Sequence, residues 1–242
     1  MNADTVVRQP DRKSDTTGGI LKPLLRYAVF LLILPAALFI SSGRLDWVLA
    51  WVFIGVLLTG AGLNTFIMIR KNPGLFAERS QTREGAKTWD KVLSRLMGVF
   101  GSVGMLVIAG LDMRFGWSPQ IPLVLQIAAL VIGVLGYVLT SWAMASNRFF
   151  SAVVRIQTDR GHTVVSSGPY QLVRHPGYAG GIICTLTMPI ILSSLWAFIL
   201  VGLLISTYIV RTALEDRTLQ NELDGYKEYA QQVRYRLLPR IW

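Results

Sequence analysis

Residues 178–210 read "YAGGIICTLTMPIILSSLWAFILVGLLISTYIV", a run of 33 positions without a charged side chain. A helix needs about 20 apolar residues to cross the hydrocarbon core of a bilayer, so this run is too long for one span. Ser193 and Ser194 lie near its middle, and their hydroxyls can cap the start of a second helix. The stretch therefore predicts two membrane helices joined by a short turn.

Four further apolar segments precede this hairpin, at residues 24–42, 45–69, 96–111 and 122–145. Of the 242 residues, 52% are hydrophobic and 16% are charged. Soluble domains carry roughly 25% charged residues. We therefore predict an all-α, polytopic membrane protein of about six transmembrane helices.

The positions of the basic residues test this topology independently of hydropathy, because cytoplasmic segments of membrane proteins are rich in Lys and Arg. Of the 24 Lys and Arg residues, 22 lie before residue 27, in the connections 70–95 and 148–174, or after residue 210. Only Arg44 and Arg114 lie in the other connections. The pattern predicts that both termini are cytoplasmic. The expected location is the cytoplasmic membrane of a bacterium or the endoplasmic reticulum of a eukaryote.

The formal net charge of +10 does not by itself indicate nucleic acid. The same basic residues are explained by topology and by contact with the anionic lipid bilayer, so we expect no nucleic-acid partner. Cys184 is the single cysteine, which excludes a multi-cysteine metal site, and we expect no metal. The predicted spans contain almost no ionisable side chains, which disfavours a pump or ion-coupled carrier.

Three regions are expected along the chain. Residues 1–23 are polar and predict a disordered cytoplasmic tail, and residues 24–146 form an N-terminal four-helix membrane region. Residues 147–242 form a catalytic region made of a cytoplasmic loop, the helical hairpin and a C-terminal helix. The loop is longer than ordinary connections, which favours a functional segment.

The loop ends in "SSGPYQLVRHPGYAGG", residues 166–181, directly before the hairpin. His175 precedes Pro176, which disfavours helical backbone at the histidine and suits the proline to a first helical turn. The start of a helix favours anions. Arg174 adds a positive charge, and Tyr170 and Tyr178 add aromatic walls with hydroxyls. Each of these residues alone is also explained by a position at the membrane–water interface, where aromatic and basic side chains anchor the end of a helix. The set favours a ligand site.

The C-terminal segment contains a second polar group, which consists of Arg211, Glu215, Glu222, Tyr226 and Tyr229. Their spacing places them along one face if the helix continues through Gly225. The segment follows the last span, so it lies on the same side of the membrane as the loop. We therefore expect a cytoplasmic cofactor pocket built from the loop before helix 5 and the C-terminal helix. Such a pocket can receive a soluble ligand from the cytoplasm and a lipid-like one sideways.

These residues resemble the motif of the isoprenylcysteine carboxyl methyltransferase family and its bacterial relatives, which share related motifs with phospholipid N-methyltransferases. The matching positions are Gly168-Pro169-Tyr170, Val173-Arg174-His175-Pro176, Tyr178, Gly180, Arg211, Glu215-Asp216, Leu219, Gly225-Tyr226, Tyr229 and Pro239. The resemblance covers roughly the C-terminal 100 residues. It implies S-adenosylmethionine as cofactor, no Rossmann domain, and methyl transfer to a lipophilic or membrane-associated acceptor such as a prenylcysteine carboxylate.

The resemblance also implies roles for individual residues. Arg174 and His175 are the expected catalytic pair and, with the helix start at Pro176, would bind the methionyl carboxylate. Glu215 would bind the ribose hydroxyls or the ammonium group, and Tyr170, Tyr178 or Tyr226 would lie near the adenine or the sulfonium. Two positions depart from the family pattern, since Asp216 replaces a second glutamate and Gln171 replaces an arginine. The role of Asp216 stays open.

Two other functions remain as alternatives. NADPH-dependent membrane sterol and steroid reductases have a similar Arg-His-Pro-x-Tyr-x-Gly element, but they usually carry Asn and Glu where this chain has Gly177 and Gly181. A non-enzymatic membrane scaffold would tolerate alanine at His175 or Glu215 without a change in ligand binding. The acceptor is also open, because a quinone-like molecule, a phospholipid or a small thiol fits the sequence equally well.

Overall fold

The computed structural model describes residues 16–71 and 85–242, and within these ranges it contains helices and no strand. This confirms the all-α prediction. The α-helices are α1 (Thr16–Ser42), α2 (Val48–Lys71), α4 (Thr88–Leu96), α5 (Met105–Phe115), α6 (Leu123–Ser146), α7 (Pro176–Ile191), α8 (Ala197–Glu222) and α9 (Tyr226–Gln232). A π-helical segment, η1 (Met97–Gly104), joins α4 to α5, and two short 3₁₀ turns, η2 (Thr158–Arg160) and η3 (Gly168–Gln171), lie in the loop after α6.

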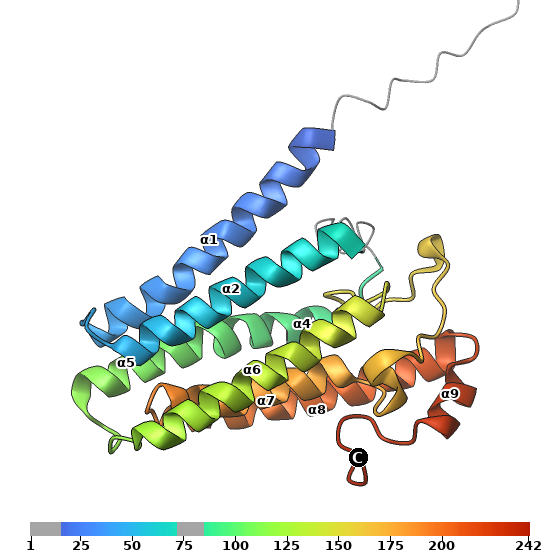
Figure 1. Cartoon of the computed structure of the whole chain (residues 1–242). Helices are drawn as coiled ribbons and strands as arrows, with labels where there is room; N and C mark the ends of the chain where they lie inside the picture. Colours follow the sequence, from blue (N-terminus) through green and yellow to red (C-terminus); the bar gives the residue numbers. More distant parts are fainter. Residues whose placement is uncertain (1–15, 72–84) are drawn as a thin grey trace, which may run out of the picture.

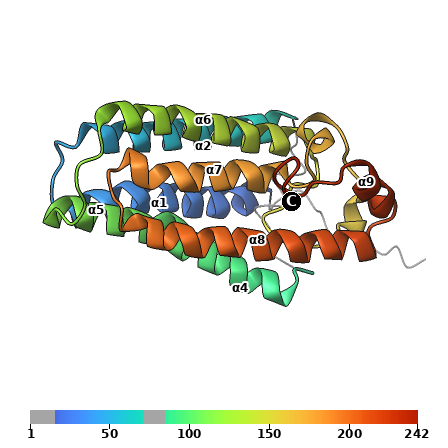
Figure 2. The ribbon, with the colours of Figure 1, turned by 90° about the horizontal axis from the view of Figure 1, so that it is seen from below.

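The long helices lie side by side in a bundle (Figure 1), and α7 lies between α6 and α8 when the bundle is seen from below (Figure 2). Each of the six segments predicted to be apolar helices is helical. The segment predicted at 96–111 is part of a longer rod that starts at Thr88 and ends at Phe115. The loop after α6, the end of α8 and α9 gather at one end of the bundle (Figure 1).

Three helices are long and apolar enough to cross a membrane, at Val48–Arg70, Leu123–Ser146 and Ala197–Glu222. Two shorter apolar helices, Ala28–Ser42 and Pro176–Ile191, accompany them. Large apolar side chains such as Val124 and Leu135 are exposed on the outer surface of α6. An apolar outer surface on long apolar helices is expected where lipid replaces water, so the chain is an integral membrane protein.

Glycines bring α6 and α7 into close contact. A Cβ atom at Gly180 would lie 2.4 Å from the carbonyl oxygen of Gly136, and one at Gly136 would lie 2.7 Å from Cγ2 of Ile183. Small residues at such crossings allow two backbones to approach in a membrane. The absence of a side chain at Gly136 therefore allows α6 to pack against α7. Gly180, which is part of the sequence motif, therefore serves helix packing.

The turn between α7 and α8 contains the two serines that were expected there. The amide of Ala197 donates to Ser194 Oγ at 3.3 Å, so this hydroxyl caps the start of α8 as predicted. Ser194 Oγ also donates to Asp112 Oδ2 at 2.6 Å. The predicted hairpin is thus tied to the end of α5.

Two expectations at the ends of the chain differ from the structure. The disordered tail predicted for residues 1–23 lies outside the described residues up to residue 15, and α1 is helical from Thr16. The prediction of one C-terminal helix that continues through Gly225 is wrong. Helix α8 ends at Glu222, Gly225 has a φ of +79°, and α9 begins at Tyr226. A left-handed glycine is a common way to end a helix, and here it turns α9 back toward α8.

Candidate functional site

A cavity of about 280 Å³ lies where the loop after α6 meets α7, α8 and α9. Its lining includes six of the seven residues that the sequence indicated as a site, which are Tyr170, Arg174, His175, Tyr178, Glu215 and Tyr226. The seventh, Pro176, is not part of the lining; it is buried at the first position of α7. The sequence motif and the C-terminal segment therefore converge on one cavity.

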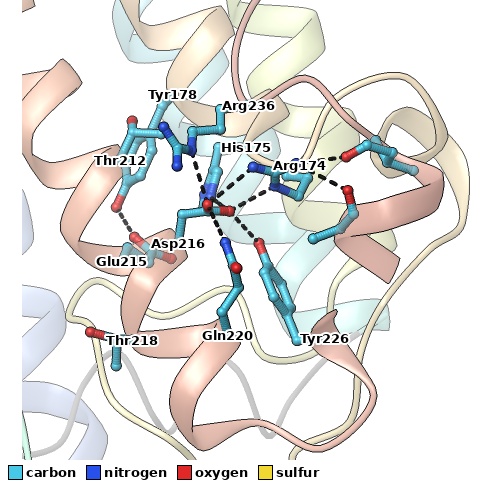
Figure 3. A network of polar contacts seen from close by, with 12 residues as sticks. Arg174, His175, Tyr178, Thr212, Glu215, Asp216, Thr218, Gln220, Tyr226 and Arg236 are labelled. Atoms are coloured by element: carbon cyan, nitrogen blue, oxygen red, sulfur yellow. Dashed lines mark hydrogen bonds and ion pairs between the residues drawn. The ribbon is translucent and has the colours of Figure 1, made fainter. Parts of the chain in front are cut away.

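Asp216 is the centre of a polar network beside this cavity (Figure 3). The carboxylate is fully buried and receives hydrogen bonds from Arg174 Nε at 2.7 Å, Arg174 Nη2 at 3.0 Å and Arg236 Nε at 2.9 Å. Gln220 Nε2 donates to it at 2.8 Å and the hydroxyl of Tyr226 at 3.1 Å. The role that the sequence left open for Asp216 is therefore to hold the C-terminal segment and α9 against α7 and α8.

Arg174 has both edges of its guanidinium engaged. One edge binds Asp216, and Nη1 donates to the carbonyl oxygens of Val233 at 2.7 Å and Arg234 at 2.9 Å. Its backbone amide donates to the carbonyl of Tyr235 at 2.9 Å. A fork of this kind fixes the geometry of both partners. Arg174 thus fastens the C-terminal segment over the start of α7.

His175 is the residue that precedes the first turn of α7, as the His-Pro pair predicted. Its φ of −126° and ψ of 60° are not helical, and its carbonyl accepts from the amides of Tyr178 and Ala179, both at 3.1 Å. The ring nitrogen Nε2 lies 3.3 Å from Asp216 Oδ1, and the ring stacks on that of Tyr178 at a centroid distance of 5.8 Å. The imidazole therefore connects the Asp216 network to the cavity.

Glu215 and Asp216 are adjacent in the sequence but belong to different surroundings. Glu215 lines the cavity and accepts a short hydrogen bond from the hydroxyl of Tyr178 (Figure 3), whereas Asp216 does not line it. Successive helical residues point about 100° apart, which explains the division. The guanidinium of Arg211 lies over the Tyr178 ring at 5.4 Å from its centroid. Arg211, Tyr178 and Glu215 thus form one wall of the cavity.

Three tyrosines that pack in one cluster, Tyr170, Tyr226 and Tyr229, also line the cavity. The hydroxyl of Tyr229 donates to the carbonyl of Tyr170 at 2.7 Å, and Asn147 Nδ2 donates to the hydroxyl of Tyr170 at 3.2 Å. Burial raises the pKa of Tyr170, Tyr226 and Tyr229 above the ordinary tyrosine value. All three hydroxyls therefore remain protonated donors at neutral pH.

His162 also lines the cavity, and the sequence analysis did not indicate it. The amide of Gln157 donates to its Nδ1 at 3.2 Å, and its ring lies 4.5 Å from that of Phe149, measured between centroids. Burial, together with nearby Arg155, Arg160 and Arg148, lowers the pKa of His162 to about 4. The imidazole is therefore neutral at pH 7, with its proton on Nε2.

Two other contributors were also missed. Arg236 belongs to no sequence motif. It reaches Asp216 because the chain turns at Gly225. Arg211 belonged to the polar helix face and to the family motif, but it was not assigned a role in the site. Its signal was present in the sequence, since Arg211 and Glu215 are four residues apart and therefore neighbours on one helix face.

Comparison with known families supports the resemblance found in the sequence. The sequence model of the isoprenylcysteine carboxyl methyltransferase (ICMT) family matches residues 128–221, which include the Arg-His-Pro motif and the acidic pair. The resemblance to this family is thereby confirmed for this part of the chain.

Two curated rice proteins, from Oryza sativa subsp. indica and subsp. japonica, are similar to the chain. Each is named "Probable protein-S-isoprenylcysteine O-methyltransferase" and is 28% identical over 107 residues. The match covers 43% of this chain and 56% of each rice protein, so the chain matches about half the length of these relatives. Neither the family nor these relatives are reductases, so the comparisons do not support the reductase alternative.

Proposed function

We propose that this chain transfers a methyl group from S-adenosylmethionine to a lipophilic acceptor at the membrane surface, with a prenylcysteine-type carboxylate as the acceptor. The observation that carries the proposal is the cavity itself. It gathers Tyr178, Glu215 and Arg211 from the segment that matches the methyltransferase family, at the end of apolar helices. The sequence resemblance and the cavity thus support the same site.

The residues around the cavity fit the cofactor. Glu215 is half-buried and presents a carboxylate, which suits ribose hydroxyls or an ammonium group. The ring of Tyr226 suits an adenine or a sulfonium cation, whereas the Tyr178 ring already contacts His175 and Arg211 and offers its remaining surface. When bound, S-adenosylmethionine would supply an electrophilic methyl group on sulfur.

We assign Arg174 a positioning role instead of direct carboxylate binding, because its guanidinium already holds Asp216 and two carbonyls. Pro176 starts α7 and thereby places His175 at the cavity. Arg211 is the better candidate for a ligand carboxylate. Within the described part of the chain, the contact of its Nη1 is a long one, to the sulfur of Met97 at 3.8 Å.

A carboxylate acceptor needs no general base, because it is already a nucleophile. The chain therefore contributes alignment of the two reactants and exclusion of water. Arg211 is buried and Tyr178 is half-buried, which limits the access of water to this part of the cavity. His175, held by Asp216, orients the Tyr178 ring on which it stacks.

We also propose that the bundle crosses the membrane six times, with the cavity and both termini on the cytoplasmic side. The distribution of basic residues supports this orientation, because Arg148, Arg155 and Arg160 lie in the cavity loop and Arg44 and Arg114 lie in the opposite connections. Helix α7 has 16 residues and is about 24 Å long, which is shorter than the hydrocarbon core of a bilayer. The bilayer therefore has to thin locally around it, or the neighbouring helices have to tilt. Labelling of single cysteines introduced at Arg44 and Arg148 in sealed vesicles tests this orientation.

The activity is tested with the purified protein in lipid nanodiscs and S-adenosylmethionine labelled on its methyl group. N-acetyl-S-farnesylcysteine is the acceptor, and its carboxamide, which lacks the carboxylate, is the control. We expect label to enter the acid and not the amide. Glu215→Gln should abolish transfer. Glu222→Gln, on the same helix but exposed and paired with Lys87, should not.

Transfer to a quinone, a phospholipid or a thiol in place of the acid would keep the enzyme class and change the acceptor. Binding of NADPH, or of neither cofactor, would contradict the proposed function.

A further inference from the structure

Asp90 is a fully buried carboxylate to which no motif assigns a role. It lies in the first turn of α4, and its exposed fraction is 0%. Helix α4 precedes the segment that the family model matches, which begins at residue 128. A buried charge is costly unless it is paired, so its partners indicate why it is there.

The two oxygens of Asp90 contact two parts of the cavity wall. Oδ2 accepts from the amide of Val154 at 2.8 Å, and Oδ1 forms an ion pair with Arg211 Nε at 2.8 Å. Val154 and Arg211 both line the cavity, whereas Asp90 does not. Asp90 therefore lies behind the wall and holds two of its members.

Arg211 carries this contact to the cavity. Its Nη2 donates to the carbonyl of Ala152 at 3.0 Å, and its guanidinium lies over Tyr178, whose hydroxyl donates to Glu215. A sequence of contacts thus runs from Asp90 through Arg211 and Tyr178 to Glu215. Each step is between buried or half-buried side chains.

Glu215 is the competing partner for Arg211. The two residues are four positions apart on α8, so their side chains are neighbours on the helix surface. If Asp90 lost its charge, Glu215 on the same helix would be a carboxylate to which the guanidinium of Arg211 could turn instead. Glu215 would then be engaged by Arg211 and withdrawn from a ligand.

We infer that Asp90 is a positioning residue for the cavity, which keeps Arg211 against Tyr178 and leaves Glu215 free to bind a ligand. The identity of that ligand as an adenosyl cofactor rests on the proposed function. Helix α4, which precedes the segment matched by the family model, therefore completes the site, although none of the described residues before Asn147 lines the cavity.

The protein contains a matched control for this ion pair. Lys87 and Glu222 also join α4 to α8, with Nζ at 2.7 Å from Oε1, but their side chains are 33% and 44% exposed. Neither residue lines the cavity. Loss of this exposed pair removes a link between the same two helices without a change in the wall.

The test measures the dissociation constant of S-adenosylhomocysteine for the full chain in detergent, for Asp90→Asn, Arg211→Met, the double variant and Glu222→Gln. We expect Asp90→Asn to weaken binding about tenfold when Arg211 is present and less than about twofold when it is methionine. Glu222→Gln should bind like the parent. If Asp90→Asn weakened binding merely by loosening the fold, it would weaken binding equally in the Arg211→Met background. Equal losses in both backgrounds, or no loss, would overturn the inference.

A second readout does not depend on the ligand. Val153→Cys in a Cys184→Ser background places one thiol in the wall, where Val153 is 7% exposed. We expect Asp90→Asn to accelerate maleimide labelling at position 153 and Glu222→Gln to leave it unchanged. If the parent binds no adenosyl ligand, the proposed function fails, and the labelling rates alone decide the role of Asp90. Equal rates in Asp90→Asn and Glu222→Gln would then refute it.

Discussion

Two buried carboxylates at opposite ends of the bundle are held in different ways. Asp112, at the end of α5, has neutral donors among the described residues, which are the amide and hydroxyl of Ser118 at 2.7 and 2.6 Å and the hydroxyl of Ser194 at 2.6 Å. Asp216, near the end of α8, is held by the guanidinium groups of Arg174 and Arg236 and lies beside His175.

The difference lies in what each carboxylate organises. Asp112 joins two connecting turns of the bundle, and neither it nor its partners Ser118 and Ser194 line the cavity. Asp216 holds residues that reach a cavity, with Glu215 beside it on α8 facing that cavity. Burial of a carboxylate thus does not identify a functional site. The acid that lines the cavity is the half-buried Glu215 next to Asp216.

The largest effect is expected from Asp216→Ala. The change leaves Arg174 and Arg236 without their buried partner, and loss of one member of a buried pair costs about 3–5 kcal/mol. We expect a large drop in the free energy of unfolding together with loss of ligand binding. Urea denaturation followed by circular dichroism measures the first effect. A variant as stable as the parent would contradict the central role of Asp216.

Asp112→Ala should separate stability from binding. It leaves the hydroxyls of Ser118 and Ser194 without their acceptor, which costs about 1–3 kcal/mol. The dissociation constant of an adenosyl ligand should stay within about twofold of the parent value, because Asp112 is far from the cavity and distant sites without shared partners rarely affect each other. Thermal denaturation and calorimetry on the same preparation test both statements. A large loss of affinity would remove the distinction between the two ends.

Tyr226→Phe is the milder change at the Asp216 end. It removes one hydrogen bond of 3.1 Å to a carboxylate that keeps its other donors, with an expected cost of about 0.5–1.5 kcal/mol. Hydrogen exchange should report faster opening of α9 and no change around Asp112. Equal effects at both ends would show that α9 is not held locally by Asp216.

The smallest effect is expected from His162, and it depends on pH. The folded-state pKa of His162, about 4, lies below the ordinary histidine value of 6.5. Between these values the unfolded chain binds a proton that the folded chain does not, so stability falls as pH is lowered through this window and is restored above it. His162→Asn should flatten this part of the stability curve. A slope unchanged by the substitution would contradict the burial of a neutral imidazole.

Much of the architecture follows from the sequence. The apolar runs gave the positions of the helices, and the serines between α7 and α8 gave the turn. Six of the seven residues that the sequence indicated line the cavity, four of them from the loop and the start of α7 and two from the C-terminal segment. These features are local, because hydrophobic pattern, capping and the proline restriction act over a few residues.

The partners of Asp216 and Asp90 were not predictable in this way. Arg236 is 20 residues from Asp216, and Asp90 is 64 residues from Val154. The contact between Arg236 and Asp216 depends on the reversal of the chain at Gly225. The sequence pattern alone is also compatible with a helix that continues through this glycine. The second contact depends on how α4 packs against α8, which no pattern within either helix specifies.

The most direct test of the account is calorimetric titration of the purified chain with S-adenosylhomocysteine, together with Glu215→Gln and Asp112→Asn. We predict saturable binding to the parent, an affinity reduced about tenfold or more by Glu215→Gln, and binding retained in Asp112→Asn despite its lower stability. No binding to the parent, or equal losses in both variants, would contradict the assignment of the cavity as the cofactor site.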